Sequence, residues 1–256
     1  MLTLNHKSFG QGDPVIILHG LFGTLDNWQT VGKQLAEDYL VYLLDQRNHG
    51  RSPHVEGLTY PLMAEDLQAF LESNWMYESH IIGHSMGGKV AMQFALEYPD
   101  MVDKLVVVDI APKSYVGGHE IIFKALLGLD LMKLEGRKEA DDKLAEMGIE
   151  EFGVRQFLLK NLMRRKEGGY RWKMNLTEIY KHYADILKNI DGDGVYEGET
   201  LFIRGEKSGY IQDADWAMVK ARFPNARLET IANSGHWVHA EAPRELLRLV
   251  KDFLKS

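Results

Sequence analysis

The most informative absence from this chain of 256 residues is cysteine, of which it has none. Without cysteine the chain can form no disulfide, supply no thiol nucleophile and build no cysteine-based zinc site. It also lacks an apolar run of the roughly 20 residues needed to span a bilayer. Its first residues, Met1 to Lys7, do not have the layout of a signal peptide. We therefore expect a cytoplasmic protein with no membrane partner.

The chain also has no excess of positive charge. The chain carries 37 acidic and 30 basic residues, and its formal net charge is −7. This balance argues against nucleic acid or an anionic membrane as a partner. The remaining composition, 45% hydrophobic and 26% charged, is that of a globular protein. Its length fits one large α/β domain or a core with an insertion.

Strand patterns alternate with helical patterns over the first 112 residues. Continuous apolar runs are typical of parallel strands buried on both faces. The expected strands cover residues 2–9, 14–18, 40–44, 79–82, 104–109, 200–203 and 227–231. The expected helices cover residues 27–37, 61–73, 89–97, 213–222 and 243–254. This alternation predicts a mostly parallel sheet wrapped by helices.

The alternation stops between residues 113 and 197, where no strong strand pattern is found. Charged, amphipathic stretches there predict helices. They cover residues 119–133, 137–148, 150–166 and 171–190. We therefore predict a single core, residues 1–112 and 198–256, interrupted by a helical insertion after the strand that ends at Asp109. Two independent domains are not expected.

The stretch Gly83-His84-Ser85-Met86-Gly87-Gly88 lies between an expected strand and an expected helix. A Gly-x-Ser-x-Gly motif in this context is a nucleophile elbow. We expect a turn so tight that side chains at Gly83 and Gly87 would collide with neighbouring backbone. The turn would hold the Ser85 hydroxyl above the sheet, where the helix N-terminus favours negative charge. The motif alone leaves open an ordinary glycine-rich turn with a solvent-facing serine.

A serine hydroxyl needs a base within hydrogen-bond reach, and the base needs an orienting acid. His236 is the best candidate base, because it follows the last expected strand and catalytic groups gather at the carboxyl ends of parallel strands. His239 could suggest a metal pair with it, but no third ligand has the spacing of a zinc motif, so no metal is expected. We expect His84 to line the pocket and His19 to hold its loop.

The sequence indicates the orienting acid less clearly than it indicates the serine and the histidine. Asp109 ends the strand that follows the elbow strand in sequence, at the sheet edge where Ser85 is expected. Glu206 and Asp213 are the alternatives. Asp109 could also be a simple turn former at a strand end.

Two backbone amides are needed to stabilise an oxyanion. The first is expected from Met86, the residue after the serine. The second is expected from the loop 19–23, with Leu21 as the first choice and Phe22 as the second. Phe22, His84 and Trp237 are the residues expected to line the substrate pocket.

Several motifs together resemble the α/β-hydrolase superfamily over roughly residues 13–112 and 198–254. They are His19-Gly20, the run from Asp45 to Ser52, the stretch 83–88, and Gly235-His236 with Glu241 and Pro243. Further stretches resemble the small bacterial YbfF-type esterases. These are the run 19–28, Asp109-Ile110-Ala111-Pro112 and the run 236–241.

The resemblance implies hydrolysis of short acyl esters or acyl-CoA thioesters without a cofactor. It also implies that residues 113–197 form a helical cap over the site. The commonest superfamily pattern puts the acid after the strand at 200–204, where Ser208 stands here. A serine cannot replace a carboxylate in that role, and the resemblance to YbfF-type esterases places the acid at Asp109.

We therefore predict an α/β-hydrolase fold and a serine carboxylesterase acting on short to medium acyl chains. Ser85, His236 and Asp109 would form its triad, without metal or cofactor, in a monomer or homodimer. Thioester or carbon–carbon bond hydrolysis on the same triad is an alternative. A ligand-binding receptor on a hydrolase scaffold is an alternative from another class.

Overall fold

A seven-stranded, mostly parallel sheet crosses the computed structural model, which describes residues 2–256. Met1, part of the predicted core, lies outside the described residues. The strand order is β1-β3-β2-β4-β5-β8-β9, and within this sheet, as residues 2–256 form it, only the pairing of β1 with β3 is antiparallel. The strands are β1 (His6–Phe9), β2 (Pro14–Leu18), β3 (Leu40–Leu44), β4 (Ser79–His84), β5 (Val102–Val108), β8 (Glu199–Gly205) and β9 (Ala226–Ile231).

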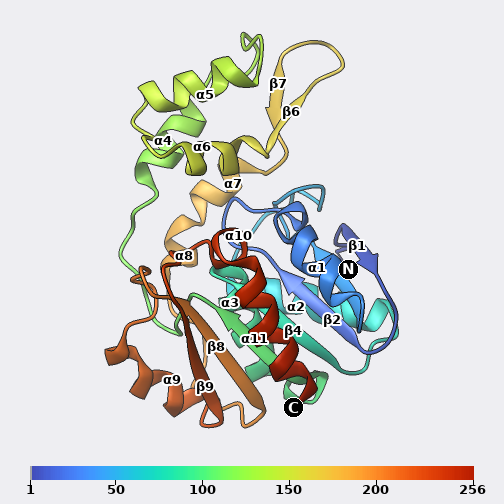
Figure 1. Cartoon of the computed structure of the whole chain (residues 1–256). Helices are drawn as coiled ribbons and strands as arrows, with labels where there is room; N and C mark the ends of the chain where they lie inside the picture. Colours follow the sequence, from blue (N-terminus) through green and yellow to red (C-terminus); the bar gives the residue numbers. More distant parts are fainter. Residues whose placement is uncertain (1) are drawn as a thin grey trace.

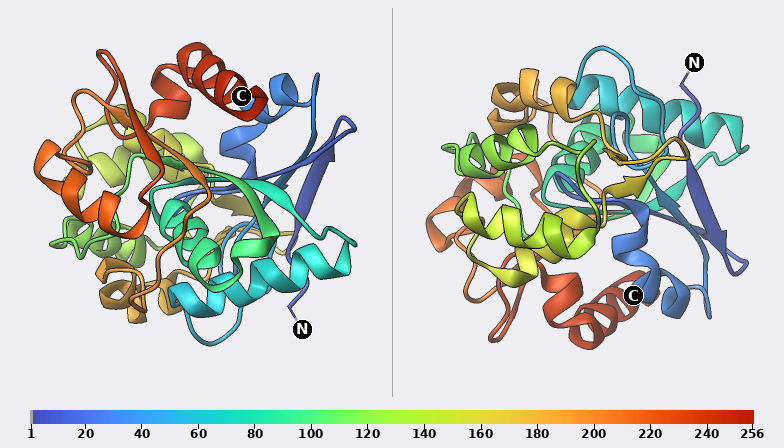
Figure 2. Two further views of the ribbon diagram at one scale, coloured as in Figure 1. Left: turned by 90° about the horizontal axis from the view of Figure 1, so that it is seen from below. Right: turned by 90° about the horizontal axis from the view of Figure 1, so that it is seen from above.

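Helices cover both faces of this sheet (Figure 2). On one face lie α1 (Gln29–Leu35), which follows the 3-10 turn η1 (Leu25–Trp28), and α11 (Pro243–Lys255). On the other face lie α2 (Tyr60–Ser73) and α3 (Met86–Glu97). The remaining elements of the core are η2 (Pro99–Met101), η3 (Asp213–Asp215), α9 (Trp216–Arg222) and α10 (Val238–Glu241).

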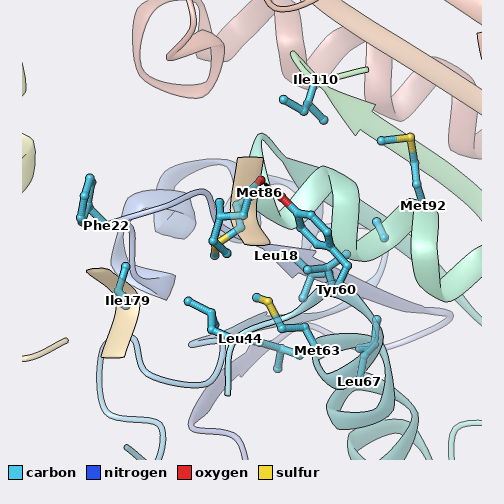
Figure 3. Close-up of a cluster of buried hydrophobic side chains, with 14 of the residues drawn as sticks. Leu18, Phe22, Leu44, Tyr60, Met63, Leu67, Met86, Met92, Ile110 and Ile179 are labelled. Carbon is cyan, nitrogen blue, oxygen red and sulfur yellow. Dashed lines mark hydrogen bonds between the residues drawn. The ribbon is translucent and has the colours of Figure 1, made fainter. Parts of the chain in front are cut away.

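The continuous apolar strands are explained by burial on both faces. In β2, Val15 and Ile17 pack into the cluster beneath α1 and α11, whereas Ile16 and Leu18 pack into the cluster on the other face. Successive side chains of a strand point to opposite faces, so only an unbroken apolar run fills both layers. Figure 3 shows part of the second cluster, where Leu18 gathers with Met86 and with side chains of β3 and α2.

Residues 113–197 cross the carboxyl-end side of the sheet and extend beyond it, with α4, α5, α6 and a short hairpin at the top of Figure 1. The helices are α4 (Glu120–Gly128), α5 (Arg137–Glu146), α6 (Phe152–Leu159), α7 (Leu176–Lys181) and α8 (Tyr183–Leu187). Within residues 2–256, no helix combines the length and apolar character needed to cross a bilayer.

The prediction of continuous helices over 150–166 and 171–190 is wrong. After α6, β6 (Leu162–Arg164) and β7 (Tyr170–Trp172) pair as an antiparallel hairpin. Gly168 and Gly169 have φ of +97° and +68°, which glycine adopts readily, and the chain reverses there. Strands of three residues are too short to show a period of two, so the charged sequence around them reads as helix.

Candidate active site

The strand order brings four loops to one edge of the sheet. Ser85 follows β4, Asp109 follows β5, Ser208 lies after β8 and His236 lies after β9. These four strands are successive neighbours in the sheet and run in parallel, so their carboxyl ends meet side by side.

Ser85 has a backbone conformation that L-residues rarely adopt, with φ of +53° and ψ of −119°. Its neighbours explain how the turn closes. A Cβ on Gly83 would lie 2.2 Å from the carbonyl oxygen of Gly87. A Cβ on Gly87 would lie 2.5 Å from the carbonyl oxygens of Leu18 and His19. The expected collision of side chains at these glycines is therefore confirmed.

The His236 ring lies between Ser85 and Asp109. Its Nε2 is 3.0 Å from Ser85 Oγ, and its Nδ1 is 2.7 Å from Asp109 Oδ2. An ionised carboxylate can only accept, so Nδ1–H donates to Asp109 and Nε2 is left to accept the Ser85 proton. The Tyr210 ring stacks on this imidazole with 3.9 Å between ring centroids.

Asp109 is fully buried, and its carboxylate is surrounded by donors. Besides His236, it accepts hydrogen bonds from the Gly205 N–H at 3.0 Å and from the Ser208 hydroxyl. Such donors compensate the loss of water around a buried charge. Of the two alternative acids, Glu206 accepts a bond from the Asn233 N–H and Asp213 pairs with Arg204. The structure thus brings Asp109 to His236.

The candidate oxyanion amides lie beside Ser85. Leu21 and Phe22 occupy the centre of a turn closed by a 2.9 Å bond from the Gly23 N–H to the Gly20 carbonyl. Met86 is the first residue of α3, where backbone N–H groups have no partner within the helix. Over residues 2–256, no protein acceptor is found for the N–H of any of these three residues. The buried side-chain amide of Asn161 donates a 2.7 Å hydrogen bond to the Phe22 carbonyl.

A cavity of about 420 Å³ opens over Ser85 and His236. Phe22, His84 and Trp237, the three expected pocket residues, are among those that line it. Residues 113–197 also contribute to the lining, with Tyr115, Phe157, Leu158 and Tyr183 among them. The lining is mainly aromatic and aliphatic, as in sites for small organic ligands.

Three histidines around the elbow are structural rather than free to exchange protons. His84 Nε2 donates to the His236 carbonyl at 2.8 Å, and burial holds the His84 pKa well below its ordinary value. The ring of His19 donates to the Gly20 carbonyl and accepts from the Gln46 N–H, while burial lowers its pKa to about 4. His239 stacks on Trp28, and burial lowers its pKa to about 3.

The described part of the chain also contains no group of three or more His, Asp or Glu side chains arranged to hold a metal ion. The His239 ring lies against the rings of Trp28 and His84.

A family model described as the alpha/beta hydrolase fold matches residues 13–243. The chain belongs to the α/β-hydrolase fold family. A curated relative from Danio rerio, the sn-1-specific diacylglycerol lipase ABHD11, is 39% identical over 96% of this chain and 80% of its own length. Esterase YbfF of Escherichia coli is 36% identical over 95% of this chain and 93% of its own length.

A solved structure described as a marine microorganism esterase superposes with a TM-score of 0.96. It is 43% identical and covers 99% of this chain and 100% of its own. The predicted resemblance to YbfF-type esterases is confirmed, and the names of these relatives support a hydrolase of the ester type.

Two contacts in this α/β-hydrolase site had not been predicted from its sequence. Tyr210 stacks on His236, and its carbonyl accepts a 2.8 Å bond from the Tyr115 hydroxyl. Ser208 had been noted where the superfamily usually has its acid, but not as a donor to Asp109. Both residues lie in the loop after β8, and the only sequence signal for them was the missing carboxylate there.

Proposed function

We propose that this protein hydrolyses carboxylic esters with short to medium acyl chains through an acyl-enzyme formed on Ser85. The observation that carries the proposal is the continuous chain of hydrogen bonds from Ser85 through His236 to Asp109. It gives a serine hydroxyl the base and the orienting acid that it needs as a nucleophile. The apolar cavity above it fits the hydrocarbon part of an ester.

In this mechanism His236 removes the Ser85 proton as Oγ attacks the ester carbonyl. The amides of Met86 and Leu21 hold the oxyanion, and the His236 imidazolium then protonates the departing alcohol. Asp109 keeps the imidazole in the required tautomer. His236 next activates a water that releases the acid and restores Ser85. Each step uses protein groups and water alone.

We also propose that residues 113–197 act as a cap on a core made of residues 1–112 and 198–256. This division is supported by the cavity, whose lining combines Ser85 and His236 with residues on both sides of the proposed boundary. The cap would then set the length and shape of the acyl chain that the site accepts.

Steady-state hydrolysis of a chain-length series of p-nitrophenyl esters and acyl-CoAs tests the proposal directly. We expect many turnovers by the wild type on at least one short or medium ester. Ser85→Ala should lower kcat by about 10⁶-fold or to the detection limit, because the nucleophile is lost. Folding of the variant is checked by its thermal unfolding.

The alternative activities give different results in the same assay. Turnover of acyl-CoAs without esters would indicate a thioesterase. A single slow acylation of Ser85, without further turnover, would contradict ester hydrolysis and favour a receptor built on this scaffold.

A further inference from the structure

Lys89 lies one helical turn beyond Ser85 on α3, and its N–H bonds to the Ser85 carbonyl at 3.1 Å. The residue is only 1% exposed, yet it lines the same cavity as Ser85 and His236. Lysine is almost never fully buried unless it has a partner of opposite charge. This position therefore needs a physical explanation.

Among the described residues, the groups around the Lys89 ammonium are uncharged. Nζ donates to the Lys188 carbonyl and lies 5.3 Å from the ring centroid of Tyr60 and 4.7 Å from that of Tyr115. Burial raises the pKa of both phenols, so they are neutral near pH 7. No carboxylate within residues 2–256 lies at ion-pair distance from this ammonium.

Two other lysines, the half-buried Lys113 and the buried Lys104, show the usual arrangement. Lys113 pairs with Asp215 at 2.6 Å, and Lys104 lies 3.7 Å from Glu199. Lys113 also lies 5.2 Å from the ring of Tyr115, but it does not line the cavity. Lys89 thus differs from them in facing the cavity without a carboxylate.

Burial without a negative partner lowers the Lys89 pKa to about 7. An ammonium has three donors, and the Lys188 carbonyl engages one of them. An anion that reaches a buried cation within the cavity attracts it more strongly than it would in water, because the local dielectric is lower. A substrate carboxylate is the simplest group that would supply that charge beside Ser85.

We propose that Lys89 binds a carboxylate carried by the ester substrate, on its acyl chain or on its alcohol, and so selects carboxylated esters. This inference rests on the proposed ester hydrolysis at Ser85. Lys89 would contact substrate away from the reacting carbonyl, as a specificity-determining residue of that site.

Matched pairs of esters test the proposal, because each pair differs only in a terminal methyl or carboxylate. Methyl hexanoate is compared with monomethyl adipate for the acyl side, and butyl acetate with 4-acetoxybutanoate for the alcohol side. The test variant is Lys89→Met, which keeps the length of the side chain and removes its charge. The control variant is Lys113→Met, which removes the other ammonium that lies near the Tyr115 ring.

We expect Lys89→Met to lower kcat/KM by about 10- to 100-fold for the carboxylated member of one pair, mainly through KM. The neutral member should change less than about threefold, and Lys113→Met should leave the ratio within each pair unchanged. The pair that responds identifies the side that carries the carboxylate. Equal losses on both members would overturn the proposal, since Lys89 would then only hold the Lys188 carbonyl. Hydrolysis of a neutral ester by the wild type without hydrolysis of either carboxylated ester would also overturn it.

The pH dependence of the ratio within the responding pair gives a second readout. The groups that face the ammonium are Tyr60 from α2, Tyr115 from the segment before α4 and the Lys188 carbonyl after α8, with the Lys113–Asp215 pair beyond Tyr115. Preference for the carboxylated ester should fall as pH rises past about 7, where Lys89 loses its proton. The catalytic steps that both esters share cancel in the ratio. A ratio independent of pH in the wild type would contradict the role of Lys89.

Failure of the proposed function can be told apart from failure of this inference. If the wild type hydrolyses no ester, calorimetry measures adipate binding to Ser85→Ala and to the double variant Ser85→Ala/Lys89→Met. Binding that is lost only in the double variant supports the carboxylate site. Absence of binding to Ser85→Ala overturns it.

Discussion

Four of the six non-glycine residues with positive φ among residues 2–256 lie at or near the candidate catalytic residues. Ser85, Asp109 and Phe22 are non-glycine residues with φ of +53°, +54° and +59°. Asn233, with φ of +60°, lies three residues before His236. Such conformations cost on the order of 1–3 kcal/mol each and persist only where the surroundings enforce them. Their gathering at one sheet edge supports a site whose groups are fixed before substrate binds.

At Asp109 the decisive property is the negative charge that faces the imidazole. Asp109→Asn should lower kcat by roughly three to four orders of magnitude, because the amide favours the wrong tautomer of His236. Activity is measured on the best p-nitrophenyl ester. Asp213→Asn, which changes an alternative acid paired with Arg204, is the matched control and should retain activity. A loss below tenfold in Asp109→Asn would move the role of the acid to another carboxylate.

The tight turn from β4 to α3 sets the position of Ser85. Gly83 and Gly87 let the start of α3 press against β4 and against the end of β2. The contact is between backbone atoms, so neighbouring side chains cannot relieve it by changing rotamer. The elbow therefore depends on the absence of side chains at two positions as much as on the serine.

Gly87→Ala should destabilise the protein by about 3 kcal/mol, because the added methyl meets two backbone carbonyl oxygens. Urea unfolding measures the effect. Gly153→Ala in α6 is the control, since a Cβ there meets nothing within 4 Å. It should be neutral or raise stability by roughly 0.5–1 kcal/mol, as alanine favours helix. Similar stability of Gly87→Ala and the wild type would contradict the packing described for the elbow.

Across the whole molecule, several histidines are buried as neutral rings. Burial lowers the pKa of His19 to about 4, and that of His49 and His239 to about 3. Above pH 6.5 these rings are neutral in both the folded and the unfolded chain, and their contribution to stability is complete. As pH falls below 6.5 the unfolded chain takes up protons that the folded chain does not. Stability must therefore fall on that side.

Between pH 6.5 and pH 5, the free energy of unfolding should decrease by up to about 1.4 kcal/mol per pH unit for each of these histidines. Urea unfolding at pH 7.5, 6.5, 5.7 and 5.0 measures the slope. Most carboxylates titrate below this window and contribute little to it. An unfolding free energy that stayed constant from pH 7.5 to 5.0 would contradict the neutral burial of these rings.

The sequence by itself determined the parallel sheet, because strands buried on both faces require unbroken apolar runs such as residues 14–18. It also identified the elbow at Ser85, since the motif is local and its glycines are sterically required. It failed over residues 162–172, where three-residue strands carry no periodic signal. The spacing of the charged residues in this segment is compatible with a helix as well as with a strand.

Only the tertiary structure decided which carboxylate lies against His236, because Asp109 and Glu206 both follow strands and differ in where those strands sit in the sheet. It alone showed that Tyr210 stacks on the imidazole. In the sequence, Lys89 reads as an ordinary charged position on a helix. Its burial arises from packing against Tyr60 and Tyr115, which lie far from it along the chain. Contacts between distant segments leave no periodic pattern in the sequence. The fold could therefore be predicted from the sequence, whereas the polar surroundings of the site could not.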